Sequence, residues 1–332
     1  MTEHRNVFPD FLGIGAQKCG TTWLYFNLSH HPELWLPKWK EIHFFDRLER
    51  RRPGWMDALL PRVGRKIRRR LATNIRKDLS KKDWHELRRD LSFYLGKRDL
   101  EWYGRIFEPC SGLVCGEITP AYSALDRRTV EDIALLSPDL KILYLIRNPI
   151  ERTWSSKLKP ESKSDHLDIG TMRSFAEKSF IRRRDDYVRT LDIWSSCFES
   201  SNIFIGFLED IRFHREAFLS SIFEFLGVEG DISIPRTGRK NVRSGDTMSL
   251  DVARFLAELH LELITELARR LGGPARGWLE IAQWLLNDAT GDRVPYPLWD
   301  TPAGTAFRSK VPSRLTSRPL SRFDDEGTDQ RE

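Results

Sequence analysis

The chain has little of what marks a membrane or disulfide-rich protein. It contains 4 cysteines and 4 methionines in 332 residues. No apolar run approaches the roughly 18–20 residues that a membrane span needs. The cysteines form no CxxC pair and no metal-ligand cluster, and the N-terminus lacks the basic and apolar stretches of a signal peptide. We therefore expect a reducing, cytoplasmic setting and no metal.

The chain does have enough apolar sequence for one large α/β domain. It is 40% hydrophobic and 31% charged, which excludes a collagen-like or wholly disordered chain. Residues 47–106 hold 19 lysines and arginines against 8 aspartates and glutamates, a net charge of +11, which leaves −5 for the remainder of a chain of net charge +6. Because the excess lies in one segment, we do not expect a nucleic-acid partner.

Short apolar runs alternate with helical patterns along the chain. Strands are predicted at residues 11–15, 113–116, 141–146 and 202–207. Helices are predicted at residues 21–28, from about 150, and at 127–136, 171–199, 213–226 and 249–271. This alternation predicts an α/β fold of three layers, with a central parallel sheet flanked by helices. We expect a single domain over residues 1–300 with a basic helical insertion at about 47–106, and a disordered or loosely packed tail over 301–332.

A glycine-containing turn follows the first predicted strand. Residues 13–23 have the sequence GIGAQKCGTTW. In such a turn, free N–H groups and the positive end of the helix dipole face a bound anion. Lys18 adds a full charge, and Thr21 and Thr22 add hydroxyl donors. Since Lys18 precedes Gly20, the match to a magnesium-dependent nucleotide triphosphatase loop is poor, and we predict a phosphate site without a metal.

Arg147 ends the strongest predicted strand, and Ser155 lies eight residues later in the next predicted helix. Parallel sheets gather functional groups at the carboxyl ends of their strands, so we expect Arg147 to share a cleft with Lys18. The fork of an arginine side chain suits a terminal phosphate, and the alternative is that Arg147 caps the strand and pairs with a nearby carboxylate. The two segments together predict a site that binds two phosphates.

Residues 40–46, with the sequence KEIHFFD, combine a carboxylate with an imidazole. Group transfer to a hydroxyl needs a base to remove the proton, and Glu41 is the candidate. Its apolar neighbours Phe44 and Phe45 predict a raised pKa for this carboxylate. His43 and Asp46 are the remaining polar groups of the segment.

These segments resemble sulfotransferases that use 3′-phosphoadenosine-5′-phosphosulfate (PAPS). The first turn is similar to their 5′-phosphosulfate loop, and LIRNPIERTWS at residues 145–155 is similar to their 3′-phosphate segment. The resemblance implies that Arg147 and Ser155 grip the 3′-phosphate and that Trp23 stacks on adenine, unless Trp23 is a core residue. It implies a P-loop-like fold and these loop contacts to the donor: Lys18, Cys19, Gly20, Thr21, Thr22 and Trp23.

Two later segments resemble the same family. FLEDI at 207–211, followed by FLG at 225–227, is similar to a segment that usually reads Tyr-Glu-Asp-Leu, with Leu208 in place of the tyrosine. GRKNVR at 238–243 is similar to a basic loop that closes over the 3′-phosphate. The resemblance makes Arg239, Lys240 and Asn241 candidate donor contacts, with an ordinary basic surface loop as the alternative.

The KEIHFFD segment is similar to glycan sulfotransferases. The resemblance implies that Glu41 is the catalytic base and that His43 supports it, together with Asp46. The next strand, in the stretch GEITPAY at 116–122, has Glu117 where a lysine is common in the family. Lys40 is a candidate replacement for that cation, and Glu117 is an alternative base.

The basic insertion contains two amphipathic patterns. One is a stripe over residues 56–71, and the other passes through Trp84, Leu87 and Leu91. Three interpretations stay open: a helical lid, contact with a membrane or lipid-linked acceptor, and contact with an anionic glycan. In each of them the insertion borders the acceptor site.

We predict an enzyme that transfers a sulfuryl group from PAPS to a hydroxyl of a glycan, a lipid-linked glycan or a natural product and releases 3′-phosphoadenosine-5′-phosphate (PAP). Glu41 is the predicted base, and Lys18 stabilises the leaving phosphate. A P-loop kinase and a basic membrane- or nucleic-acid-binding module are the alternatives. The acceptor, the choice between O- and N-sulfation, and the oligomeric state stay open.

Overall fold

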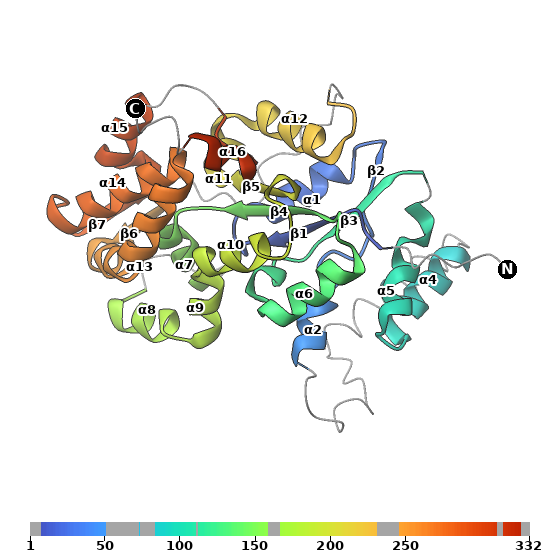
Figure 1. Cartoon of the computed structure of the whole chain (residues 1–332). Coiled ribbons are helices and arrows are strands. Elements are labelled where there is room, and N and C mark those ends of the chain that lie inside the picture. The colour runs from blue at the N-terminus through green and yellow to red at the C-terminus, as the bar shows by residue number, and fades with distance from the viewer. Residues whose placement is uncertain are drawn as a thin grey trace.

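The computed structural model describes residues 8–50, 73, 84–110, 112–158, 167–230, 246–310 and 315–326. Its main sheet has six strands in the order β2-β3-β1-β4-β5-β8 (Figure 1). Five of them run parallel, namely β1 (Phe11–Gly15), β2 (Leu34–Trp35), β3 (Val114–Ile118), β4 (Lys141–Ile146) and β5 (Ile203–Phe207). A separate antiparallel pair consists of β6 (Asp246–Ser249) and β7 (Arg293–Tyr296).

The central strands are buried on both faces of the sheet. Every residue of β1 and β5 is buried, and so is every residue of β4 after Lys141. Strands covered on both faces have near-continuous apolar sequences, which is why their positions could be predicted closely.

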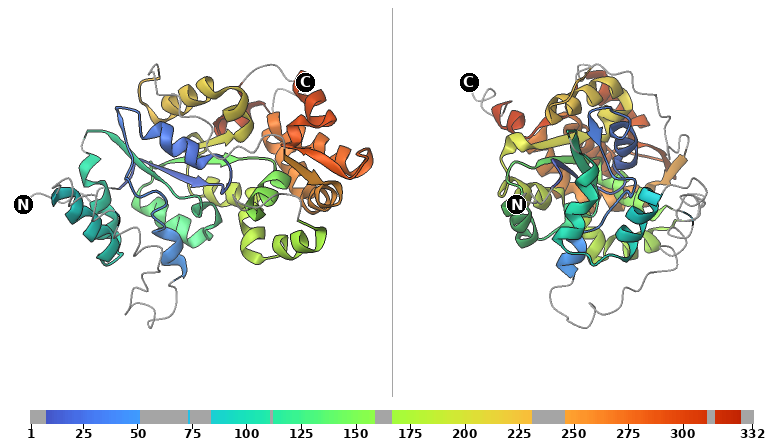
Figure 2. Two further views of the ribbon diagram at one scale, coloured as in Figure 1. Left: turned by 180° about the vertical axis from the view of Figure 1, so that it is seen from behind. Right: turned by 90° about the vertical axis from the view of Figure 1, so that its right-hand side faces the viewer.

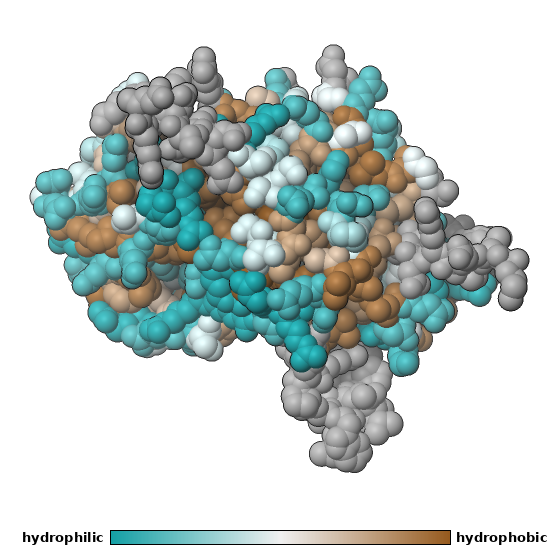
Figure 3. All heavy atoms as spheres, in the orientation of Figure 1, coloured by the Kyte–Doolittle hydropathy of each residue, from teal (hydrophilic) through white to brown (hydrophobic). Residues whose placement is uncertain are grey.

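Figure 3 shows how the surface on one side mixes hydrophilic areas with a hydrophobic area in the middle.

Helices cover the sheet on both faces (Figures 1 and 2). On one face lie α1 (Thr21–Leu28) and α12 (Arg215–Leu226), and on the other lie α6 (Arg127–Leu136) and α10 (Tyr187–Ser195). The α1 and α12 helices pack through Trp23 and Phe218, whose ring centroids are 6.1 Å apart. The predicted three-layer α/β fold is confirmed.

The helix predicted over residues 171–199 is three helices: α8 (Ile169–Ala176), α9 (Ser179–Asp185) and α10. The backbone leaves the helical conformation at Lys178 and at Asp186. The Asp186 side chain accepts a hydrogen bond from the Arg189 N–H at 2.9 Å and so caps α10. The long predicted helix was therefore wrong, because an aspartate inside the pattern begins a new helix.

The long helix α13 (Leu250–Leu271) ends at Gly272, as predicted. It is followed at once by α14 (Gly273–Asn287), which packs against it as a helical hairpin. The other described helices are α2 (Phe45–Arg50), α4 (Trp84–Leu95), α5 (Leu100–Phe107), α7 (Pro149–Lys157), α11 (Leu208–Phe213), α15 (Pro302–Lys310) and α16 (Ser321–Glu326). None of the helices in the described ranges has both the length and the apolar character to cross a bilayer.

The α4 helix of the insertion buries a different face from the one predicted. Trp84 is 67% exposed and Leu91 is also exposed, whereas Asp90 and Phe93 are buried. Phe93 stacks on Trp39 with a centroid distance of 4.2 Å, and the Trp39 indole donates to Asp90 at 2.8 Å. The buried face thus includes a carboxylate with a specific partner, which an apolar stripe does not reveal. The predicted stripe at 56–71 lies outside the described residues.

Cys110 and Cys115 are paired as a disulfide beside the start of β3, and Cys19 and Cys197 are free. The spacing of the cysteines did not indicate this pair. Disulfides are rare in reducing compartments, so this pair does not support the expected reducing setting. The cytoplasmic location stays a prediction.

The tail predicted to be disordered from residue 301 is structured over its described residues. The strand β8 (Arg318–Pro319) pairs antiparallel with β5, and Phe307 of α15 and Phe323 of α16 are buried. The Asp210 carboxylate accepts hydrogen bonds from the Ser317 N–H at 2.7 Å and the Ser317 hydroxyl at 2.6 Å. For residues 301–310 and 315–326 the prediction was wrong, because a polar composition does not reveal a partner held elsewhere in the chain.

We expect Asp210→Ala to destabilise the protein by about 1–3 kcal/mol, because it leaves buried donors of the tail without an acceptor. Chemical denaturation measures this change in the free energy of unfolding. Asp139→Ala, at an exposed position, is the matched control. Equal stability of the two variants would contradict the role of Asp210.

Candidate active site

The loop between β1 and α1 has the backbone of an anion site. Gly20 occupies the N-cap of α1 with φ 88°, a left-handed conformation that glycine adopts without a steric penalty. No side chain caps this helix, so its first N–H groups are not covered by a capping group. Lys18 lies two residues earlier in the loop, and Thr21 is buried while Thr22 is half-buried. This arrangement can hold a phosphate group through backbone donors.

The segment that contains the predicted base meets this loop directly. The Lys40 ammonium donates to the Thr22 hydroxyl at 2.5 Å and lies 3.6 Å from the Glu41 carboxylate. The other Glu41 oxygen lies 3.6 Å from His43 Nε2, and His43 Nδ1 lies 3.1 Å from Asp46 Oδ2. A continuous chain of polar groups therefore runs from the phosphate loop through the predicted base.

The backbone at this site is strained at three of the predicted residues. Among the described residues other than glycine, positive φ values occur at Lys18 (72°), Glu41 (61°) and His43 (57°). This conformation is uncommon for residues with a Cβ, and such residues cluster at functional sites because the surroundings must enforce it. The sequence carries no signal for this feature.

The pKa of Glu41 differs from the predicted one. The pKa of Glu41 is lowered, chiefly by the hydrogen bond with His43 and further by Lys40, although partial burial acts in the opposite direction. Asp46 and then Glu41 raise the pKa of His43 to about 9. The predicted raised pKa of Glu41 was therefore wrong, because two cationic neighbours outweigh the apolar flanks.

Arg147 lies beside Lys18, as the strand geometry predicts. Its guanidinium donates to the Lys18 carbonyl at 3.2 Å and to the Tyr296 hydroxyl at 3.2 Å, and it forms an ion pair with Glu151. The residue is only 6% exposed. Arg147 thus contacts the phosphate loop through the Lys18 carbonyl, and its pair with Glu151 corresponds to the alternative of a nearby carboxylate partner.

Ser155 is half-buried in α7, one helical turn beyond Glu151. Arg147 itself precedes the N-cap of α7 and pairs with Glu151 in the first turn of the helix. The remaining predicted contacts to the 3′-phosphate, Arg239, Lys240 and Asn241, lie outside the described residues.

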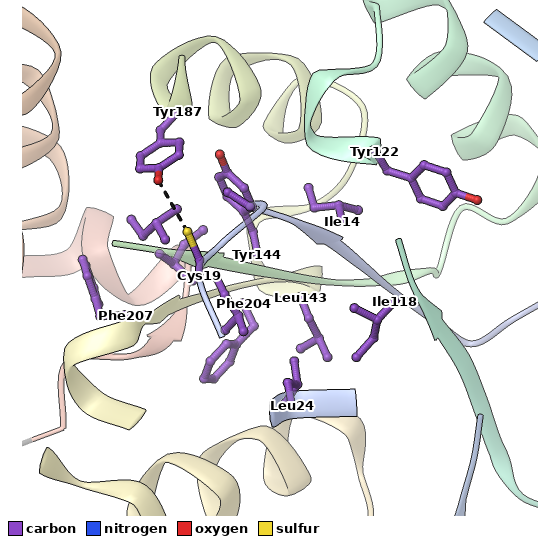
Figure 4. Close-up of a cluster of buried hydrophobic side chains, with 14 of the residues drawn as sticks. Ile14, Cys19, Leu24, Ile118, Tyr122, Leu143, Tyr144, Tyr187, Phe204 and Phe207 are labelled. Carbon is purple, nitrogen blue, oxygen red and sulfur yellow. Dashed lines mark hydrogen bonds between the residues drawn. The ribbon is translucent and has the colours of Figure 1, made fainter. Parts of the chain in front are cut away.

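Cys19 of the loop and Trp23 of α1 have side chains that are buried in the core. Cys19 is fully buried, with its sulfur 3.5 Å from the Tyr187 hydroxyl, and burial raises the pKa of its thiol to about 11 (Figure 4). Trp23 is 8% exposed and packs on Phe218. Cys19 can therefore contribute to a donor site only through its backbone, and the packing of Trp23 corresponds to the alternative of a core residue.

Glu117 does not have the surroundings of a second base. It is 1% exposed and accepts hydrogen bonds from Tyr103 and Tyr122 at 2.8 Å each and from Thr119 at 2.6 Å. Burial raises the pKa of this carboxylate. An enclosed group with three donors cannot reach an acceptor hydroxyl, which leaves Glu41 as the base candidate.

Comparison with known proteins gives consistent results. The family model described as "Sulfotransferase family" matches residues 9–231. The chain is 24% identical to human heparan sulfate glucosamine 3-O-sulfotransferase 6 over 234 residues, which are 68% of this chain and 54% of that protein. The match thus spans about half the length of this relative.

Among solved structures, the chain is similar to a sulfotransferase from Alicyclobacillus acidocaldarius, with a TM-score of 0.49 and 22% identity over 86% of this chain and 98% of that one. It is also similar to the sulfotransferase domain from the curacin biosynthetic pathway, with a TM-score of 0.45 and 16% identity over 67% of this chain and 75% of that one.

We expect His43 to stay protonated at neutral pH and to lose its proton near pH 9. Because its pKa in the folded state exceeds the ordinary value of 6.5, the stabilisation from its pairs is fully present below pH 6.5 and is lost as the pH rises through about 9. NMR titration of the imidazole protons measures the midpoint.

Asp46→Asn should move this midpoint down toward 6.5, while Asp139→Asn, at an exposed position, should leave it unchanged. A midpoint near 6.5 in the unmodified protein would contradict the pairing of His43 with Asp46 and Glu41.

Proposed function

Because the chain belongs to the sulfotransferase family, we propose that it transfers the sulfuryl group of PAPS to an acceptor hydroxyl and releases PAP. The contact of Lys40 with Thr22, with Glu41 on the other side of the same ammonium, carries this proposal. It sets a carboxylate beside the phosphate loop, where a base for sulfuryl transfer must lie. Family membership argues against the kinase and the binding module.

The phosphate loop holds the donor in this scheme. PAPS supplies a sulfuryl group bonded to the oxygen of a good leaving group, the 5′-phosphate. Lys18 and the N–H groups at the start of α1 neutralise the charge that develops on this phosphate as its bond to sulfur breaks. Arg147 keeps Lys18 in place through the Lys18 carbonyl. Such preorganised charge, with correct positioning, accounts for most of the rate of a transfer of this kind.

Glu41 removes the proton from the acceptor. The acceptor oxygen forms a bond to sulfur, and its proton passes to the Glu41 carboxylate. His43 and Lys40 lower the pKa of Glu41, so it is ionised and able to accept a proton at neutral pH. His43 is itself protonated up to about pH 9, and it therefore orients Glu41 rather than acting as the base.

Lys40 provides the cation that the family resemblance places at the end of β3. The matching position in that strand is Glu117, a carboxylate that is only 1% exposed. The Lys40 ammonium instead approaches the donor loop from the KEIHFFD segment through Thr22. Its position between donor loop and base suits it to stabilise the sulfuryl group during transfer.

We propose a glycan hydroxyl as the acceptor. The name of the human relative, a heparan sulfate glucosamine 3-O-sulfotransferase, supports this class over a natural product. A lipid-linked glycan and peripheral membrane contact through residues 47–106 stay predictions, since most of that segment lies outside the described residues.

We expect Lys18→Ala to lower the rate of sulfuryl transfer by about 100-fold or more, because the leaving phosphate loses a full positive charge. A transfer assay with PAPS and a panel of glycan acceptors measures the rate. Lys141→Ala is the matched control, because Lys141 begins β4 at the edge opposite to Arg147. Full activity of Lys18→Ala would contradict the proposed transfer mechanism.

Glu41→Gln should retain PAP binding but lose about 10²–10⁴-fold in turnover, the usual contribution of a general base. Calorimetry with PAP and the transfer assay separate the two effects. Glu131→Gln, at an exposed position on α6, should behave like the unmodified protein. Unchanged turnover in Glu41→Gln would assign the base to another group.

A further inference from the structure

A buried polar cluster at the end of β3 connects the phosphate loop with the segment that contains Glu41. It consists of Glu117, Thr119, Tyr122 and Tyr103, all with side chains almost fully enclosed. Glu117 is its centre, because all three hydroxyl groups donate to its carboxylate. The proposed reaction uses none of these groups directly.

One arm of the cluster reaches the phosphate loop. The Thr119 N–H donates to the Gly13 carbonyl of β1 at 2.9 Å, while its hydroxyl donates to Glu117 at 2.6 Å. The turn after β3 also packs tightly on the loop, since a Cβ added at Gly15 would lie 2.9 Å from the Ser123 side chain. The position of Glu117 is thereby fixed relative to the start of the phosphate loop.

The other arm reaches the segment of the base. The Tyr122 hydroxyl donates to Glu117 at 2.8 Å and accepts a hydrogen bond from the Phe44 N–H at 3.0 Å. Phe44 follows His43 directly, and both His43 and Glu41 hold left-handed backbone conformations. A hydroxyl that donates at one end and accepts at the other polarises both bonds, which strengthens and orients the pair.

We propose that Glu117 and Tyr122 are positioning residues that hold the Glu41 segment at a fixed distance from the phosphate loop. This inference rests on the proposed function for its effect on catalysis. Without the Tyr122 hydroxyl, the Phe44 N–H loses its partner in a dry environment, and the left-handed turn at Glu41 and His43 loses the bond that enforces it. The Glu41 carboxylate then moves relative to PAPS, while the phosphate loop itself is unchanged.

The chain provides a matched pair of variants for this test. Tyr103 and Tyr122 are both fully buried, and each donates to the same Glu117 oxygen at 2.8 Å, but the Phe44 N–H bonds only to Tyr122 in the described structure. Tyr103→Phe and Tyr122→Phe each keep the ring and remove one hydroxyl. Both variants therefore lose one hydrogen bond to Glu117, and only Tyr122→Phe releases the base segment.

We expect Tyr122→Phe to lower kcat by about 10- to 100-fold, the effect of a small misplacement of a reacting group. Its affinity for PAP and its KM for PAPS should stay within about twofold of the unmodified protein, because the donor loop is intact. Tyr103→Phe should keep kcat within about threefold, because the Phe44 N–H keeps its bond to Tyr122 and the base stays in position. Thermal unfolding checks that both variants still fold, and Tyr122→Phe should be the less stable of the two because it also leaves the Phe44 N–H without an acceptor.

A second measurement does not depend on activity. Hydrogen exchange at the Phe44 amide should accelerate in Tyr122→Phe but not in Tyr103→Phe, and the NMR titration of His43 should shift only in Tyr122→Phe. Equal losses of kcat in the two variants, or unchanged Phe44 exchange in Tyr122→Phe, would overturn the proposal. Absence of PAP binding by the unmodified protein would overturn the proposed function instead, and the exchange result would still decide the role of Tyr122.

Discussion

The order of the strands is the constraint on which the site depends. Because β1 lies between β3 and β4 and all three run parallel, their carboxyl ends open on the same edge of the sheet. The phosphate loop leaves β1, Arg147 follows β4, and the cluster around Glu117 lies at the end of β3. Segments that are more than a hundred residues apart in sequence thus meet without any of them having to be long or flexible.

Much of this arrangement could be predicted from the sequence. The strands β1 and β4 stand out as uninterrupted apolar runs, and the loop around Lys18 and the KEIHFFD segment contain residue types with specific chemistry. Parallel geometry then predicts that Arg147 lies near Lys18, and the structure places its guanidinium against the Lys18 carbonyl. Local pattern and one topological rule were sufficient for these features.

Other features depend on contacts that no local pattern encodes. The lowered pKa of Glu41 arises from His43 and Lys40, whereas the sequence emphasised its apolar neighbours. The burial of Trp23 follows from α12, which is nearly two hundred residues away. The structured tail depends on Asp210, a single buried carboxylate that accepts from Ser317. Tertiary partners decided the outcome in each of these cases.

The pairing of the tail with β5 also changes what the main sheet offers to other molecules. An open sheet usually presents unpaired backbone groups at its edges, and these groups promote strand-by-strand aggregation. Among the described residues the outermost strands are β2 and β8, each of only two residues, and β8 includes Pro319, which has no N–H to donate. The longer apolar strands β3, β1, β4 and β5 lie in the interior of the sheet. The sheet is therefore poorly suited to pair with a strand of a neighbouring chain.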